Sequence, residues 1–489
     1  SSFEARHGLD IDLLTRGARF GYLGSTLTSL IYATFTFIFF ALEATILGVA
    51  LQMVSGWPLG LCYLVASLGV IPLVMHGITL ISRLQWWTQP LWILLCLLPY
   101  AAVALQDPGK FREFSSLAGR LSGSAGFDAV MFGAAATVAF SVVVQIGEQV
   151  DYLRFLPEKT RENRWRWWGA VLVAGPGWIL PGMLKMLGGA FLGFLVLQEQ
   201  RPVEQAIDPM HMYLAGFGYV FHDPRWALGA AALFVVVSQV KINLTNAYAG
   251  SLAWSNFFAR LTHSHPGRVV WLVFNVIIAV LLMTLGVFEA LERVLGLYSN
   301  VAIAWVGALV ADLVINKPLG LSPRDVQFKR AYLYDINPVG LGATLIAAVL
   351  AVVAYAGVIG PLAQAYAPFI ALLTALITAP LLAWLTRGRY YAAREDTGRW
   401  APGERVGCSV CANRFESEDM ATCPAYGAPI CSLCCTLESR CHDRCKTDAR
   451  AADQVRLLLE RLLPARLSAL VNFRVAHYLV VAVSLIALL

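Results

Sequence analysis

Charged residues are scarce in this sequence. Asp, Glu, Lys and Arg make up 14% of its 489 residues, whereas a soluble protein carries about a quarter. Hydrophobic residues make up 58%, which excludes an ordinary soluble enzyme, a disordered chain and a nucleic-acid-binding protein. The net charge of +6 is too small to indicate a polyanionic partner. The composition therefore predicts an all-α polytopic membrane protein surrounded by lipid.

Polar interruptions of the apolar runs are also few. A helix needs about 20 apolar residues to cross a hydrocarbon core of roughly 30 Å. Ten runs meet this requirement and are predicted as spans: 24–53, 58–82, 86–105, 127–147, 166–198, 227–253, 269–288, 294–316, 337–358 and 365–386. An additional run, 472–489, is still apolar at the last residue, and the sequence begins without Met or a signal-peptide layout. Both ends therefore look truncated, and we expect a piece of a longer protein.

The Lys and Arg residues between the runs favour one orientation. If the N-terminus is cytoplasmic, the loops on its side of the membrane hold most of these residues. Short basic loops stay in the cytoplasm. We therefore expect that a cytoplasmic segment, 1–23, precedes the first span. The region after Arg387 returns to the cytoplasm.

Several short motifs occur in a familiar order. The stretch 17–25, GARFGYLGS, resembles the Arg-x-Ser-Phe-Gly-x-x-Gly-Ala motif before the third helix of the nucleobase–cation symporter family. That family includes hydantoin, purine and cytosine permeases. The stretch 149–155, QVDYLRF, is similar to its Asp-Tyr-x-Arg signature after helix six, and 307–312, GALVAD, to its exit from helix ten. The loop 334–340 fits the segment before helix eleven.

This resemblance covers roughly residues 15 to 390 and implies a fold. The ten runs then match helices three to twelve of a permease-like transmembrane domain, 24–390, without the first two helices. The implied architecture is a five-helix inverted-repeat transporter fold. Substrate and cation would lie near the midplane, beside broken helices one and six.

The resemblance also implies ligand-binding residues. Where the family places an aromatic ring and an amide four apart on its third helix, this sequence has Phe39 and Glu43. A carboxylate favours a ligand with N–H donors or a positive charge. The family's second stacking ring, a Trp on helix six, falls at about Val142, so half of the aromatic sandwich is lost. Lys185 lies in another span and receives no role.

On the eighth helix the family binds sodium through a Ser-Thr pair, and the matching positions here are Lys241 and Ile242. An ammonium cannot ligate sodium but supplies the same charge. We therefore interpret Lys241 as a substitute for the cation, in a sodium-independent module where it pairs with a carboxylate such as Glu43. Asn243 and Asn246 are further expected ligand contacts. The alternative for the two charges is a structural ion pair or side chains that reach toward the interface.

The loop after the sixth helix carries Asp151 and Arg154. One interpretation is a cytoplasmic gate held by charge pairs. The other is a helix terminus with basic residues that set the topology.

Cysteine is almost confined to one region. Cys-x2-Cys knuckles place two thiolates within reach of one tetrahedral ion, which predicts a zinc-binding module at 404–448. A reducing cytoplasm argues against disulfides, and an iron–sulfur cluster is the alternative metal. We expect two structural zinc ions, with His442 able to replace one thiolate. One division assigns Cys408, Cys411, Cys431 and Cys434 to the first ion, and Cys423, Cys435, Cys441 and Cys445 to the second.

A connector helix, 449–471, and a truncated transmembrane helix, 472–489, follow the module. This order resembles the transporter-like N-terminal region of bacterial hybrid sensor histidine kinases, which implies a location in a bacterial inner membrane. It predicts a sensory module that binds a small ligand, nitrogen-containing ligands included, and relays its occupancy to cytoplasmic kinase or response-regulator domains, with a homodimer as one option.

No phosphoacceptor-His motif or ATP-binding glycine box occurs, so we predict no catalytic residue, and kinase activity would need a missing C-terminal part. Two alternatives stay open. One is a sodium-independent secondary transporter of nucleobase-like solutes. The other is a metalloregulatory module in which zinc availability is the signal.

Overall fold

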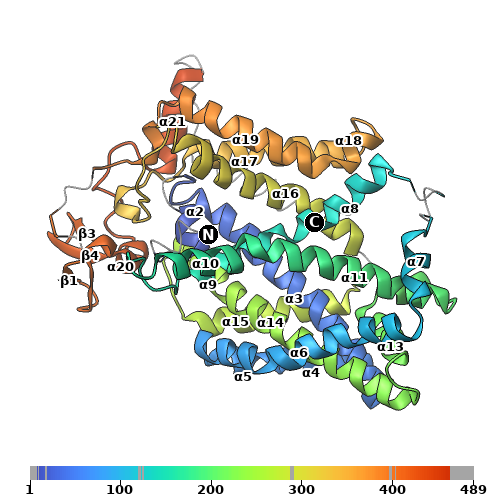
Figure 1. Cartoon of the computed structure of the whole chain (residues 1–489). Coiled ribbons are helices and arrows are strands. Elements are labelled where there is room, and N and C mark those ends of the chain that lie inside the picture. Colours follow the sequence, from blue (N-terminus) through green and yellow to red (C-terminus); the bar gives the residue numbers. More distant parts are fainter. Residues whose placement is uncertain are drawn as a thin grey trace.

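The computed structural model describes residues 8, 10–16, 19–118, 123, 126–286, 291–395, 399–401 and 403–462. Within these ranges the chain forms a bundle of long helices with a small Cys-rich module attached at one end (Figure 1). We call this end of the bundle the module end. The predicted span 472–489 and the second half of the predicted connector lie outside the described residues.

Helices make up the bundle. Their bounds are α2 (Ile11–Arg16), α3 (Ser25–Ser55), α4 (Leu59–Leu68), α5 (Val70–Met75), α6 (Ile78–Gln106), α7 (Gly109–Ser115), α8 (Ala129–Ser141), η1 (Val142–Gln145), α9 (Ile146–Leu153), α10 (Arg164–Ala174), η2 (Pro176–Trp178), α11 (Ile179–Gln198), α12 (Val203–Ala206), α13 (Pro209–Gly218), α14 (Pro224–Thr262), α15 (Arg268–Thr284), α16 (Leu291–Ala311), η3 (Asp312–Asn316), η4 (Arg330–Tyr332), α17 (Pro338–Tyr355), α18 (Pro361–Ala365), α19 (Ala367–Leu385) and η5 (Arg389–Tyr391).

Among the described residues, eight helical segments are long and apolar enough to cross a membrane. Two more, Leu59–Met75 and Arg268–Thr284, are apolar but shorter. Together they coincide with the ten predicted runs, so the prediction of an all-α polytopic membrane protein is confirmed.

Several predicted spans have the wrong boundaries: α6 begins before the predicted 86–105, and α14 extends beyond the predicted 227–253. Two further spans differ more. The run 58–82 ends early, because Gly77 adopts a φ of 79° and α6 begins directly after it. The run 166–198 is divided into α10 and α11 at Gly175–Trp178. Gly175 leaves the helical conformation, with a ψ of −107°, and Pro176 after it has no N–H to donate to the preceding turn, so α10 ends here.

The fourth predicted span, 127–147, which matches helix six of the family, is interrupted, as the resemblance implied. A 3-10 turn, η1, separates α8 from α9. It contains three consecutive valines, whose β-branched side chains are crowded in an α-helix. The break therefore lies at the segment where the family places its second stacking ring.

Small residues bring α16, α17 and α19 close together. Alanines recur every four residues along α19, at 371, 375, 379 and 383, and all are fully buried. A Cβ added to Gly307 of α16 would lie 2.9 Å from the Cβ of Ala375. Such residues let helix backbones approach closely where lipid removes the hydrophobic drive between helices. In Figure 1 these helices lie on one side of α3, and α4 to α6 lie on the other.

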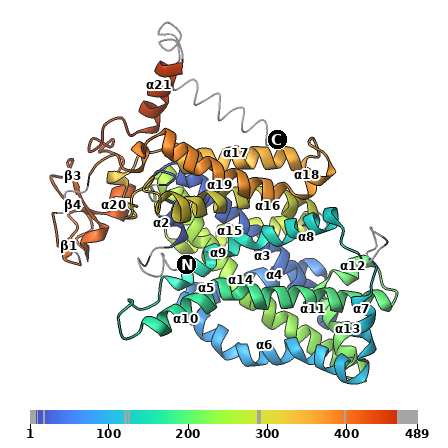
Figure 2. The same ribbon diagram turned by 45° about the horizontal axis from the view of Figure 1, so that its top comes forward.

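The Cys-rich module consists of two small hairpins and a short helix. Strands β1 (Arg405–Gly407) and β2 (Arg414–Glu416) pair antiparallel, as do β3 (Met420–Cys423) and β4 (Ala428–Cys431). The turn η6 (Ser417–Asp419) and the helix α20 (Ser432–Leu437) complete it. Helix α21 (Ala451–Leu462) then leads away from the bundle (Figure 2).

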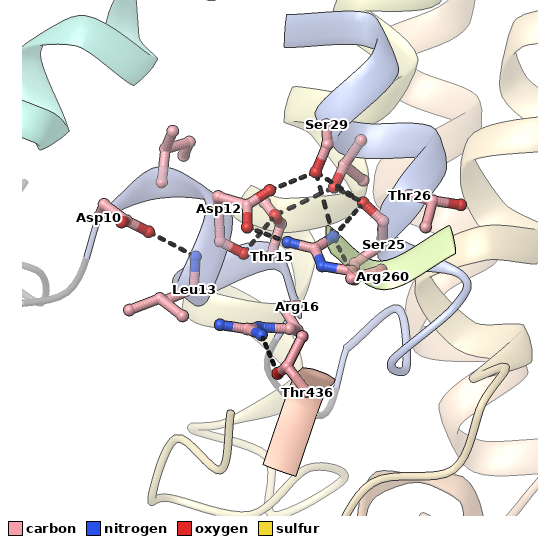
Figure 3. Close-up of polar contacts among 12 residues, drawn as sticks. Asp10, Asp12, Leu13, Thr15, Arg16, Ser25, Thr26, Ser29, Arg260 and Thr436 are labelled. Carbon is pink, nitrogen blue, oxygen red and sulfur yellow. Dashed lines mark hydrogen bonds and ion pairs between the residues drawn. The ribbon is translucent and has the colours of Figure 1, made fainter. Parts of the chain in front are cut away.

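A buried ion pair holds α2 against α3 and α14 at the module end. The Asp12 carboxylate binds the guanidinium of Arg260 and the hydroxyl of Ser29 (Figure 3). Arg260 also donates to the carbonyl and the hydroxyl of Ser25, both at 2.9 Å. Arg260 is 1% exposed and Asp12 is 5% exposed, so neither charge has water as an alternative partner.

This pair makes a prediction for stability. Replacing Asp12→Asn leaves the Arg260 charge buried without its carboxylate, which costs about 3–5 kcal/mol. We expect a clear loss of thermal stability of the purified protein in detergent, followed by tryptophan fluorescence. The control is Glu113→Gln, which removes a solvent-exposed pair with Lys110. An Asp12→Asn variant as stable as this control would contradict the assignment.

Candidate functional site

Helices α3 and α14 run antiparallel, and their register can be followed from contacts. At the module end Arg260 binds Ser25. Further along, a Cβ on Gly250 would lie 2.6 Å from the Thr36 hydroxyl, and beyond it the Glu43 carboxyl lies beside the Gln239 amide. The segment 243–246 of α14 therefore lies opposite 39–43 of α3.

Two buried amides lie in this part of α14. Asn243 and Asn246 follow Gln239 at a spacing of four and three residues, so all three share one helix face. Both asparagines are fully buried. Their side-chain nitrogen and oxygen atoms have no hydrogen-bond partner among the described residues. Buried polar groups are nearly always hydrogen-bonded to protein or water, so these four atoms are candidates to bind a ligand or ordered water.

The predicted ligand residues of α3 lie across from them. Phe39 is 6% exposed, and its ring centroid lies 4.5 Å from that of Phe35. Glu43 follows one turn later on the same helix. The structure thus brings Phe39, Glu43, Asn243 and Asn246 to facing sides of two helices. Their role in binding stays a prediction.

Lys241 points elsewhere. Its ammonium donates to the Gln89 side chain at 2.7 Å and to the Gln85 carbonyl at 3.2 Å, both on α6. The expected pairing with Glu43 is therefore wrong. Residue 241 is two positions from Gln239, so at about 100° per residue its side chain leaves α14 on the opposite side.

Lys185, which the sequence left without a role, lies at the same aromatic ring as Lys241. Its ammonium lies 5.1 Å from the ring centroid of Trp92, and that of Lys241 lies 5.9 Å from the same ring. The signal in the sequence was a lone charge in an apolar run. The residue that it would approach could not be read from that run.

The two predicted gate residues each bind the segment around α2. Asp151 accepts hydrogen bonds from the Ile11 backbone N–H at 3.2 Å and from the Tyr32 hydroxyl at 3.1 Å. Arg154 forms an ion pair of 3.1 Å with Asp10. Both contacts hold α9 to the N-terminal elements at the module end. Whether they open during function stays a prediction.

Another buried ion pair joins two motifs that are far apart in the sequence. The Arg19 guanidinium lies 2.6 Å from the Asp312 carboxylate, which also accepts from the Tyr391 hydroxyl at 2.7 Å. All three side chains are buried. The family motifs contained Arg19 and Asp312, but neither motif indicated that the two residues bind each other.

The four cysteines of the first predicted metal site lie close together in the structure. The sulfur atoms of Cys408, Cys411, Cys431 and Cys434 all lie within 4.8 Å of one another. Backbone N–H groups of Val410 and Cys431 donate to the Cys408 sulfur at 3.5 and 3.3 Å. Four thiols at this spacing fit a tetrahedral thiophilic ion such as zinc, and N–H donors to the sulfur stabilise its thiolate form.

The second set is less compact. Cys423, Cys435, Cys441 and Cys445 line one small cavity beside the loop that precedes α17. Among the described residues, only the first set has all its ligand atoms within 4.8 Å. His442 lies between two of these cysteines and has a φ of 48°.

The module is attached to the membrane domain by polar contacts to Thr436 of α20. Its carbonyl accepts from His263, just after α14, at 2.8 Å, and from the Tyr22 hydroxyl, just before α3, at 3.5 Å. Its hydroxyl accepts from Arg16 of α2 at 3.4 Å, as Figure 3 shows. One residue of the module therefore contacts three elements of the bundle.

No family model and no curated protein matches the sequence. Two solved structures of Mhp1, a nucleobase-cation-symport-1 family transporter, are similar. The closed conformation with bromovinylhydantoin bound gives a TM-score of 0.53 at 16% identity, over 79% of this chain and 84% of that one. The inward-facing conformation gives 0.52 at 17% identity, over 80% and 84%. This chain has the same fold. The predicted transporter fold is thereby confirmed, while an identity this low shows the fold alone.

The metal site makes a prediction about removal. The core of the module contains Val406, Met420 and Ile430 together with cysteines of the first set, so little apolar surface remains without metal. A chelator should therefore make 404–448 sensitive to protease while the far-UV circular dichroism of the bundle persists. Cys408→Ser should have the same effect without chelator. A module that stays protease-resistant in both cases would contradict a metal-dependent fold.

Proposed function

We propose that the chain binds a small solute in a transporter-type membrane domain and transmits the occupancy of that site to its Cys-rich module. The observation that carries this proposal is the pair of buried amides, Asn243 and Asn246, which have no partner in the described part of the chain and lie opposite Phe39 and Glu43. The transporter fold supports it, because solute sites in such folds lie between helices near the midplane.

The chemistry of these residues favours a flat solute that carries N–H donors. The Glu43 carboxylate accepts hydrogen bonds, the two amides donate and accept, and Phe39 offers a ring face. Mhp1 has been solved with bromovinylhydantoin bound. Hydantoins and nucleobases are therefore the first probes for this chain.

Sodium is not needed in this proposal. By the family resemblance, Lys241 stands where relatives have a sodium-binding residue. Its ammonium donates hydrogen bonds to two groups of α6. It would keep α14 and α6 together with a permanent positive charge, where a transporter of the family would bind a mobile ion.

The route from solute to module would run through the ends of the helices that carry the site. Helices α3 and α14 hold the candidate ligands, and Tyr22 and His263 beside their ends bind Thr436 of the module. A change in the packing of α3 against α14 would therefore alter the contacts of α20. We place zinc at the first cysteine set, and the module on the cytoplasmic side of a bacterial inner membrane.

A second candidate function is secondary transport, which the likeness to Mhp1 favours. In that case the solute crosses the membrane, and the Cys-rich module regulates or only stabilises the carrier. Kinase or response-regulator domains and a homodimer stay predictions of the sequence, since none of the described residues bears on them.

Ligand binding can be tested at Glu43. We expect Glu43→Gln to weaken binding of a hydantoin or nucleobase probe by at least tenfold, because a hydrogen bond to a charged group contributes about 1.5–3 kcal/mol. Asn246→Leu should act in the same direction. The control, Glu113→Gln, lies on α7 outside this site and should bind normally. Equal binding by all variants, measured by isothermal titration in detergent, would rule the site out.

Sensing and transport can be distinguished by whether a radiolabelled probe accumulates inside proteoliposomes. For a sensor, proteoliposomes should bind radiolabelled probe without concentrating it, and hydrogen exchange in α20 should change with occupancy. For a carrier, the probe should accumulate under a gradient. In either case binding should be equal in sodium and potassium media. A strong and saturable sodium dependence would contradict the role of Lys241.

A further inference from the structure

Four cysteines outside the first metal set surround a single cavity. Cys423 ends β3, Cys435 lies in α20, and Cys441 and Cys445 follow that helix. The cavity has a volume of about 20 Å³, which is room for one water-sized body. All four cysteines are free thiols. The cavity thus combines four sulfur donors with space for one ion.

The wall of this cavity does not belong to the module alone. Ala331, from the loop that precedes α17, also lines it, and the Cys445 sulfur lies 4.0 Å from the Ala331 carbonyl oxygen. The sulfurs of the first set, by contrast, lie between the turn of one hairpin and the start of α20, within the module. The two cysteine sets therefore differ in their relation to the membrane domain.

We propose that Cys423, Cys435, Cys441 and Cys445 form a second tetrahedral site for a divalent thiophilic ion of the zinc class, and that this ion fastens the module to the membrane domain. The sulfurs are spread more widely than those of the first set, so binding would draw the chain around residues 441–445 inward. Metal-coupled ordering of this kind is usual for small cysteine modules. Each ligating thiol releases its proton.

The charges around the cavity support this assignment. A divalent ion with four thiolates carries a net charge of −2, which needs nearby cations when buried. Arg330, from the same loop as Ala331, donates to the Cys435 carbonyl at 3.0 Å and to the Asp443 carboxylate at 3.0 Å. The fully buried ammonium of Lys446 donates to the Leu333 carbonyl at 2.8 Å. It also lies 3.6 Å from the Asp443 carboxylate and 3.9 Å from that of Asp335. Arg444 lines the cavity as a further cation.

Binding and docking are therefore linked. Arg330 belongs to the membrane domain, and its contacts exist only while the module is attached. If docking supplies the compensating charge, it raises the affinity for the second ion, and the second ion must stabilise docking by the same factor. The first site should not show this coupling. The inference does not rest on solute binding, since ions can be counted whether or not the chain binds a solute.

The first test counts metal in the full chain, purified in detergent with zinc present. We expect two zinc ions per chain by mass spectrometry, one in Cys423→Ser or Cys445→Ser, and one in Cys408→Ser. The matched control is Cys62→Ser, in membrane helix α4, which should retain two. One ion in the unmodified chain, no loss in the two second-site variants, or iron with acid-labile sulfide would overturn the proposal.

The second test leaves all cysteines in place. Arg330→Gln should lower the affinity of the second site for its ion by about 10- to 100-fold, as is typical when a group just outside the ligand shell is lost. The affinity of the first site should not change. A cobalt titration followed at the thiolate-to-cobalt charge-transfer absorption resolves this, because a weakened second site fills in a separate phase after the first equivalent. The control is Arg414→Gln, on the exposed strand β2. Two unchanged sites, or two equally weakened sites, would refute a link between docking and the second ion.

Discussion

The register between α3 and α14 is the constraint on which the rest of the molecule depends. At the module end Arg260 is inserted between Asp12 and Ser25, and both partners are buried. An unpaired charge at this depth would be costly, so the contact permits little sliding of one helix along the other. The same register carries Asn243 and Asn246 to the level of Phe39 and Glu43. The candidate solute site is thus positioned by an ion pair at the end of the two helices that form it.

The module end is held by more polar contacts than this one pair. Arg19 binds Asp312, and Arg154 binds Asp10. The Cys-rich module lies on the same end and is attached through Thr436 to three elements of the bundle. Alternating access in transporters requires one end of the bundle to open around a fixed site. In this chain the Cys-rich module is bound across several elements at one end of the bundle.

Much of the fold and part of the site could be predicted. The transmembrane runs follow from local hydropathy, and the first metal set follows from two Cys-x2-Cys knuckles, because both signals are encoded in neighbouring residues. The break at Gly175–Trp178 was missed although Gly and Pro mark it, since the run is apolar on both sides. The pairing of Lys241 with Gln89 was missed because it depends on which neighbour faces each side of α14.

The sequence by itself determined that the chain is an α-helical membrane protein, approximately where its apolar spans lie, and that a cysteine module follows them. Composition and short-range spacing carry this information, because lipid requires backbone hydrogen bonds to close within each helix. Only the tertiary structure decided that Arg19 binds Asp312, that Lys241 binds Gln89 of α6, and that the second cysteine set borders the membrane domain. These contacts join residues that are distant along the chain, and helix rotation and register, which local patterns do not encode, bring them together.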